Sequence, residues 1–386
     1  MSRSRRTTAG LVAALLLGLL ATPAAEAQDV ALRVGTVLPS PDAEPLTDAT
    51  LLVRGGKVEA IAHTLELPPG VPLIELPGAW VIPGLVDPWT GIAQRGDAGE
   101  SAAAVVPDVL AGEHLDRRHP DWGRARAAGI TTCLLSPGEA TLVPGWGRVV
   151  RTSGVPWTGV EPVLRVVLGS AALHRDRPPT SRGSALALLR QALVAAHGDA
   201  GAQDPLRPFA RGARAGLLTI ESGADLRAAL ELQTAFGLQV LLQLDPGLTP
   251  DDLEGLALGP SVTALVGPYD LTSPPAALRL PAALAARGVR VAFTGHPPAG
   301  PDGGGRLSAV LAVRHGLAPR AALAGLTTVP AAALAVDGQA GSLAVGRPAD
   351  LLVLDGPPLD LRSRVLGVWI DGRRVHPAPT GRGEAP

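Results

Sequence analysis

Asp87, Glu221 and Asp245 each stand at the end of an apolar run, and His296 follows a fourth such run. If these runs are parallel strands of one barrel, their carboxyl ends meet on one face and the side chains converge on one pocket. Three carboxylates and an imidazole can hold Mg²⁺, Ca²⁺ or Mn²⁺. The pattern therefore predicts a candidate metal site made of the three carboxylates, with the imidazole beside them.

The same residues also have ordinary structural interpretations. Asp87 can accept backbone amides at a strand end, and Glu221 can face solvent in a loop. Asp245 precedes a proline, which is a common turn pair, and His296 also precedes one. The residues favour these structural interpretations over a metal site, which stays the alternative.

The elements that would position these side chains are predicted from the middle of the chain. Between about residues 83 and 336, apolar runs alternate with helical patterns, as in repeated βα units. A (β/α)8 barrel usually takes ~250 residues, which is close to this span. An open doubly wound sheet is less favoured, because no G-x-G-x-x-G follows a first strand. The predicted strands include 129–135, 216–220, 238–244, 262–266 and 289–294, and the predicted helices include 184–196, 225–236, 281–287 and 307–315.

Two segments resemble the amidohydrolase superfamily, in its imidazolonepropionase-like and cytosine-deaminase-like branches. Residues 80–90, W-V-I-P-G-L-V-D-P-W-T, resemble the first barrel strand of that superfamily. Residues 341–355 and 365–375 resemble its C-terminal signature, G-S-L-x-x-G-x-x-A-D-L-x-V-L-D followed by V-x-x-V-x-x-D-G-R-x-V. The resemblance extends over nearly all of the chain after residue 28 and implies a metal-dependent hydrolase fold.

The resemblance also implies a domain organisation. In the superfamily, strands from both chain ends combine into one small β-domain, and Asp371-Gly372 fits a tight hairpin turn there. We therefore predict an α/β fold in which a TIM barrel (83–336) is inserted into a composite β-sandwich domain (28–82 and 337–378). Residues 379–386 are predicted to be a flexible tail.

Metal ligands are expected at positions where this sequence has other residues. Pro88 and Thr90 stand where the resemblance implies a His-x-His pair, with Trp89 between them. A proline has no side-chain donor atom, and a threonine hydroxyl is a weak zinc ligand. The resemblance implies further substitutions. Thr219 and Glu221 stand where a second His-x-His pair is expected, and Asp245 stands in place of a further histidine. Gly295 stands in place of an aspartate that acts as both metal ligand and base, whereas Asp225 keeps the acid that opens the next helix.

Two functions are open on this basis. The first is a catalytically degenerate amidohydrolase homologue, without catalytic residues or cofactor, that binds a small ligand or protein partner at the barrel mouth. The second is an active hydrolase of non-peptide carbon-nitrogen bonds in cyclic amides or amidines, with Zn, Mn or Mg in a carboxylate-rich site. By family analogy either is expected to form a homodimer. The candidate pocket consists of Asp87, Trp89, Thr90, Thr219, Glu221, Asp245, Gly295 and His296.

The N-terminus predicts export. Three arginines within residues 3–6 precede the apolar run 11–20, and Ala25-Glu26-Ala27 is an A-x-A cleavage site, so residues 1–27 read as a signal peptide. The apolar run is shorter than the ~20 residues that a membrane-spanning helix needs. We expect a periplasmic or extracellular protein with no transmembrane segment after cleavage, and an uncleaved anchor is the alternative.

Composition and cysteine content narrow the classes of function that remain open. A net charge of -1 argues against an electrostatic nucleic-acid binder. Cys133 is the only cysteine, so no internal disulfide forms. Its apolar run, residues 130–135, predicts a buried and inert thiol.

Overall fold

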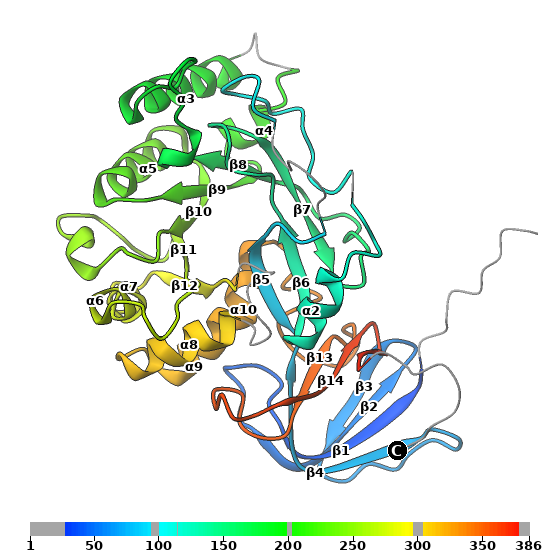
Figure 1. Ribbon diagram of the computed structural model, residues 1–386. Coiled ribbons are helices and arrows are strands. Elements are labelled where there is room, and N and C mark those ends of the chain that lie inside the picture. The colour runs from blue at the N-terminus through cyan, green and yellow to red at the C-terminus, as the bar shows by residue number, and fades with distance from the viewer. Residues whose placement is uncertain (1–27, 94–99, 114, 199–202, 296–303, 378–386) are drawn as a thin grey trace, which may run out of the picture.

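A computed structural model of the protein describes residues 28–93, 100–113, 115–198, 203–295 and 304–377. Two sheets organise it. Figure 1 shows a ring of strands and helices beside a smaller β-domain, and the blue and red segments from the two chain ends share that smaller domain. The predicted α/β fold, a barrel inserted between strands from both ends, is confirmed.

The small domain is built on one sheet of seven strands in the order β15-β14-β13-β4-β1-β2-β3. The C-terminal β13 pairs antiparallel with the N-terminal β4, so neither chain end completes the sheet alone. These strands lie in one continuous sheet rather than in the two facing sheets of a sandwich. The strands are β1 (Val30–Val37), β2 (Leu46–Arg54), β3 (Lys57–Ala62), β4 (Leu73–Pro83), β13 (Leu351–Leu354), β14 (Val365–Ile370) and β15 (Arg373–His376).

The predicted hairpin turn at Asp371-Gly372 joins β14 to β15. Both residues have positive φ, 50° and 71°, as a type I′ turn requires. Asp371 tolerates this conformation better than most residues, and glycine adopts it without steric cost. The turn follows from these two residue types.

The barrel is a sheet of eight strands that follow one another in chain order. Seven of them run parallel, and β7 runs antiparallel to both of its neighbours, which differs from a regular (β/α)8 barrel. The sheet ends at β12 and β5, which lie next to each other and leave the ring nearly closed. The strands are β5 (Leu85–Thr90), β6 (Ile130–Leu135), β7 (Gly145–Arg151), β8 (Val163–Val167), β9 (Ala215–Ile220), β10 (Gln239–Leu244), β11 (Thr263–Val266) and β12 (Arg290–Phe293).

Helices cover the outer side of the ring, as Figure 1 shows for α3, α5 and α8. The helices are α2 (Asp121–Ala127), α3 (Arg182–His197), α4 (Arg207–Ala210), α5 (Gly223–Phe236), α6 (Pro275–Leu278), α7 (Leu280–Ala286), α8 (Gly304–Arg314), α9 (Pro319–Leu326) and α10 (Thr328–Ala333), with short 3-10 turns η1 (Ser170–Ala172) and η3 (Pro250–Leu253). Among the described residues, no helix has both the length and the apolar content to cross a membrane.

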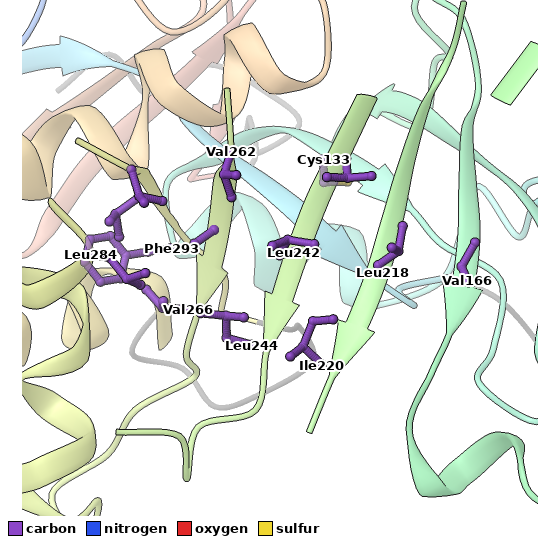
Figure 2. Close-up of a cluster of buried hydrophobic side chains, with 14 of the residues drawn as sticks. Cys133, Val166, Leu218, Ile220, Leu242, Leu244, Val262, Val266, Leu284 and Phe293 are labelled. Atoms are coloured by element: carbon purple, nitrogen blue, oxygen red, sulfur yellow. The ribbon is translucent and has the colours of Figure 1, made fainter. Parts of the chain in front are cut away.

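Alternate residues of each barrel strand face opposite sides, which gives two apolar clusters. Outward side chains such as Leu218 and Phe293 pack with helix residues such as Leu284, and Figure 2 shows this outer cluster. Cys133 belongs to it, and burial raises the pKa of its thiol well above the usual value, so the predicted inert thiol is confirmed as buried. Inward side chains form a second cluster that includes Val86, Leu134, Val163, Leu217, Leu241, Leu265 and Ala292.

Candidate functional site

The inner face of the barrel changes from apolar to polar toward the carboxyl ends of the strands. Val163, Leu217 and Leu241 lie in the inner apolar cluster. Two residues further along the same strands, on the same face, are Arg165, Thr219 and Gln243. Each of these polar residues is buried. They form a polar layer on β8, β9 and β10 above the apolar layer.

Arg165 places a positive charge inside the barrel. Its side chain has no exposed surface, and its Nη2 donates to Glu139 Oε1 and, over 2.7 Å, to Thr219 Oγ1. Burial lowers the pKa of Arg165 to about 10, while Glu139 acts in the opposite direction. The guanidinium is therefore still protonated at neutral pH.

Trp89 is the residue of the first barrel strand that faces this guanidinium. Its ring centroid lies 5.4 Å from the guanidinium carbon of Arg165, and its side chain packs on the inner cluster. Thr90 is fully buried, and its Oγ1 accepts the Ile92 amide at 3.0 Å. Of this candidate pair, Trp89 lines the polar layer and Thr90 fixes the turn after β5.

Asp87 joins the two ends of the barrel sheet. Its Oδ1 accepts the Thr294 hydroxyl at 2.8 Å and the Trp89 amide at 3.1 Å, and its Oδ2 accepts the Gly295 amide at 2.9 Å. Burial raises the pKa of Asp87 to about 6, although these hydrogen bonds oppose the shift. The carboxylate spans the seam between β5 and the end of β12.

Glu221 is engaged by a neighbouring loop and helix. Its Oε1 accepts the Ser170 amide at 2.8 Å, and its Oε2 pairs with Arg182 Nη2 at 2.7 Å. Partial burial acts to raise the pKa of Glu221, but the bonds from Ser170 and Arg182 outweigh it and lower that pKa. Arg182 also bonds to Asp225, which lies in the first turn of α5 as the sequence predicted.

The remaining candidates lie in turns at the strand ends. Asp245 is exposed, and its Oδ1 accepts the Gly247 amide at 2.8 Å, as expected of an aspartate before a proline. Gly295 contributes its backbone amide to Asp87. His296 lies outside the described residues.

The donor set of the described residues does not fit a hydrolytic metal ion. Such a site needs three or four protein ligands and an open position. Within the described ranges, no three His, Cys, Asp or Glu side chains gather into a possible metal site. Asp87 and Glu221 accept hydrogen bonds with both oxygens, and Arg165 has only N–H donors and no lone pair to offer a metal ion. The proposed carboxylate site of Asp87, Glu221 and Asp245 gains no support from this geometry.

Known proteins resemble this chain in sequence and in fold. A family model described as "Amidohydrolase family" matches residues 285–376. An imidazolonepropionase from Cupriavidus pinatubonensis is 27% identical over 414 residues, covering 89% of this chain and 93% of that protein. The crystal structure of an amidohydrolase from Thermotoga maritima superposes with a TM-score of 0.77 at 23% identity, covering 90% of this chain and 99% of that one. Residues 285–376 therefore match the amidohydrolase family, and the described chain shares the fold of a known amidohydrolase.

A more distant structural relative is a molinate hydrolase, with a TM-score of 0.59 at 16% identity over 91% of this chain and 95% of that one. Because the identity is low, it shows only that the fold is shared. The partial family match and the shared fold leave open what this chain does with its barrel.

Sequence reasoning missed Arg165 and Gln243 of the polar layer, and also Glu139, which pairs with Arg165. Arg165 carried a usable signal, because a lone arginine interrupts the apolar run V-L-R-V-V. A charge inside an otherwise apolar strand is rarely buried without a partner. Gln243 interrupts β10 in the same way.

Proposed function

We propose that this chain is an exported, catalytically degenerate amidohydrolase homologue that binds a small ligand at the mouth of its barrel. The observation that carries the proposal is the buried Arg165. Its guanidinium contacts Thr219 and faces Trp89, so a fixed cation lies among positions where the superfamily resemblance implies metal ligands.

The available donor atoms support this function over metal-dependent hydrolysis. A catalytic metal ion lowers the pKa of its bound water to ~7 only if its ligands hold it firmly in place. Here the charged side chain of the polar layer is a protonated guanidinium, which has no lone pair to offer a divalent ion. A general base must also be free to take a proton, whereas both oxygens of Asp87 already accept hydrogen bonds.

A second candidate is an active hydrolase of carbon-nitrogen bonds. The pKa of Asp87, raised to about 6 by burial, favours it, because an acid or base works best near the ambient pH. Similarity to an imidazolonepropionase over most of both chains also favours it.

Metal analysis and turnover assays on residues 28–386, purified without chelator, separate these candidates. We expect zinc, manganese and magnesium far below one ion per chain, and no hydrolysis of imidazolonepropionate or of simple cyclic amides. An active imidazolonepropionase purified in the same way is the control. About one bound ion per chain, with turnover that a chelator abolishes, would overturn the proposed function.

Export is a separate part of the proposal, supported by the signal pattern of residues 1–27. Fractionation of a bacterial host that expresses the whole chain, followed by N-terminal sequencing, tests it. We expect the protein outside the cytoplasm with Gln28 as its first residue. A full-length chain retained in the cytoplasm contradicts this part.

A further inference from the structure

The polar layer of the barrel contains buried hydrogen-bonding groups that have no partner. A guanidinium carries five N–H donors, of which Nε holds one and the two Nη atoms hold two each. Among the described residues, Nε and Nη1 of Arg165 have no hydrogen-bond partner, which leaves three of its five donors unused. The Oε1 acceptor of Gln243 is also buried and unpartnered.

Unused buried groups of this kind are costly. Most buried polar atoms in proteins have a protein or water partner, and leaving one unsatisfied destabilises the folded state, more so when the group is charged. Arg165 is 1% exposed and Gln243 is 8% exposed, so bulk water does not compensate them. The layer is complete only when a further molecule supplies acceptors for Arg165 and a donor for Gln243.

The unused groups lie near one another around Thr219. Arg165 Nη2 reaches Thr219 Oγ1 at 2.7 Å. Gln243 pairs with Thr219 in the parallel ladder between β9 and β10, where neighbouring strands lie ~4.8 Å apart. Because both side chains are on the inner face, one small molecule can contact them together.

The charges around the layer indicate what kind of molecule fits. Arg165 is paired with Glu139, so the pair is neutral overall, and adding a simple anion would bury a net charge. A molecule that is neutral overall but has a negative and a positive pole avoids this cost. Its carboxylate would take the free guanidinium donors, since charge-assisted bonds are the strong ones. Its ammonium group would donate to Gln243 Oε1.

We propose that Arg165 and Gln243 bind the carboxylate and the ammonium group of a free α-amino acid inside the barrel. The proposal rests on the degenerate function above and names its ligand class. Trp89 is half-buried, and its ring centroid lies 5.4 Å from the guanidinium carbon of Arg165, so we expect its fluorescence to report binding.

Titration of the whole mature protein with each of the common α-amino acids, followed by calorimetry and tryptophan fluorescence, tests the ligand class. We expect saturable binding of at least one amino acid. Two analogues of that amino acid should bind about 10-fold to 100-fold more weakly. One is its amide, which lacks the carboxylate, and the other is its des-amino acid, which lacks the ammonium group. The fluorescence change should disappear in Trp89→Phe, which identifies Trp89 as its source.

Variants of the polar layer test the residues. Arg165→Met should weaken binding about 10-fold to 100-fold, and Arg165→Lys should restore little, because an ammonium lacks the planar array of donors. Gln243→Leu should weaken binding by about 10-fold and provides an independent test if Arg165→Met does not fold. Arg290→Met, which changes an exposed arginine at the start of β12, is the matched control and should bind like the wild type.

Two results overturn the assignment. One is the absence of saturable binding for every amino acid, which would mean that ordered water completes the layer. The other is equal binding by the wild type, Arg165→Met and Gln243→Leu. Either result, with metal-free protein, leaves the degenerate function standing, whereas stoichiometric metal with turnover removes both proposals.

Discussion

At the scale of single residues, Asp87 shows how one side chain can keep its place in a family pattern and still have a different role. The resemblance implied that this aspartate precedes metal ligands. In the structure it accepts bonds from Thr294, Gly295 and Trp89 and so ties the last barrel strand to the first. The aspartate itself could be read from the sequence, but its partners Thr294 and Gly295 could not, because they lie 207 and 208 positions away.

The raised pKa of Asp87 predicts a pH dependence of stability. In the folded state the pKa is about 6, and in the unfolded chain it is near 3.9. Between these values the folded state binds the proton more readily, so this residue's contribution to the free energy of unfolding falls as pH rises from 4 to 6. At 1.36 kcal/mol per pKa unit, the fall is roughly 3 kcal/mol.

Urea unfolding of the wild type and Asp87→Asn at pH 4, 5, 6 and 7 measures this contribution. We expect the wild type to lose roughly 3 kcal/mol relative to the variant between pH 4 and pH 7. The comparison is needed because burial also raises the pKa of Asp350 to about 6 and gives both proteins a slope of the same sign. Parallel curves for the two proteins would show that Asp87 does not titrate in this range.

At the scale of elements, apolar periodicity predicted the barrel strands and helices whose patterns were regular. Residues 216–220 and 238–244 became β9 and β10, and residues 225–236 became most of α5. The antiparallel β7 was not predicted, because its residues G-W-G-R-V-V-R lack both a continuous apolar run and a clear alternation. The β8 strand was missed because its apolar run is short and contains Arg165.

The junction between the two sheets depends on a close approach at Gly84. This residue separates β4 from β5, and its amide donates to the Asp350 carbonyl at 3.0 Å. A Cβ at Gly84 would lie 2.8 Å from Thr131 Cβ and closer still to its hydroxyl. Thr131 is fully buried and β-branched, so it has little room to move.

Gly84→Ala should therefore lower the free energy of unfolding by about 1–3 kcal/mol, the usual cost of overpacking. Gly91→Ala is the matched control, because a Cβ there meets no atom within 4 Å and the residue is exposed just after β5. Urea denaturation of both variants checks this. Equal stability of the two variants would contradict the steric argument.

At the scale of the whole molecule, a buried ion pair connects the barrel to the composite domain. Arg151 of β7 pairs with Asp350 at 3.4 Å and with Asp371 at 3.1 Å, and it stacks over Trp157 at 3.6 Å. The C-terminal signature located Asp350 and Asp371 in the small domain. Their partner could not be predicted, because it lies on the strand that the sequence did not reveal.

Removing one member of this pair should destabilise the protein more than removing both charges. Arg151→Met leaves the Asp350 carboxylate, which is 3% exposed, without its cation. Breaking a buried pair in this way typically costs about 3–5 kcal/mol, because the remaining charge has lost its solvation and gained nothing in return. In the wild type the Asp371 amide donates to Asp350 Oδ1 at 2.7 Å. Adding Asp350→Asn removes the unpaired charge and keeps an acceptor for that amide.

We therefore expect the Arg151→Met/Asp350→Asn double variant to recover most of the stability that Arg151→Met loses. Urea unfolding at pH 7 of the wild type, both single variants and the double variant completes the cycle. Trp157 fluorescence, read beside circular dichroism, shows whether the barrel and the small domain unfold in one transition. If the double variant is no more stable than Arg151→Met, the loss comes from the packing of Arg151 on Trp157 and not from the unpaired charge. Separate transitions in Arg151→Met, with one transition in the wild type, would show that this ion pair makes the two domains unfold together.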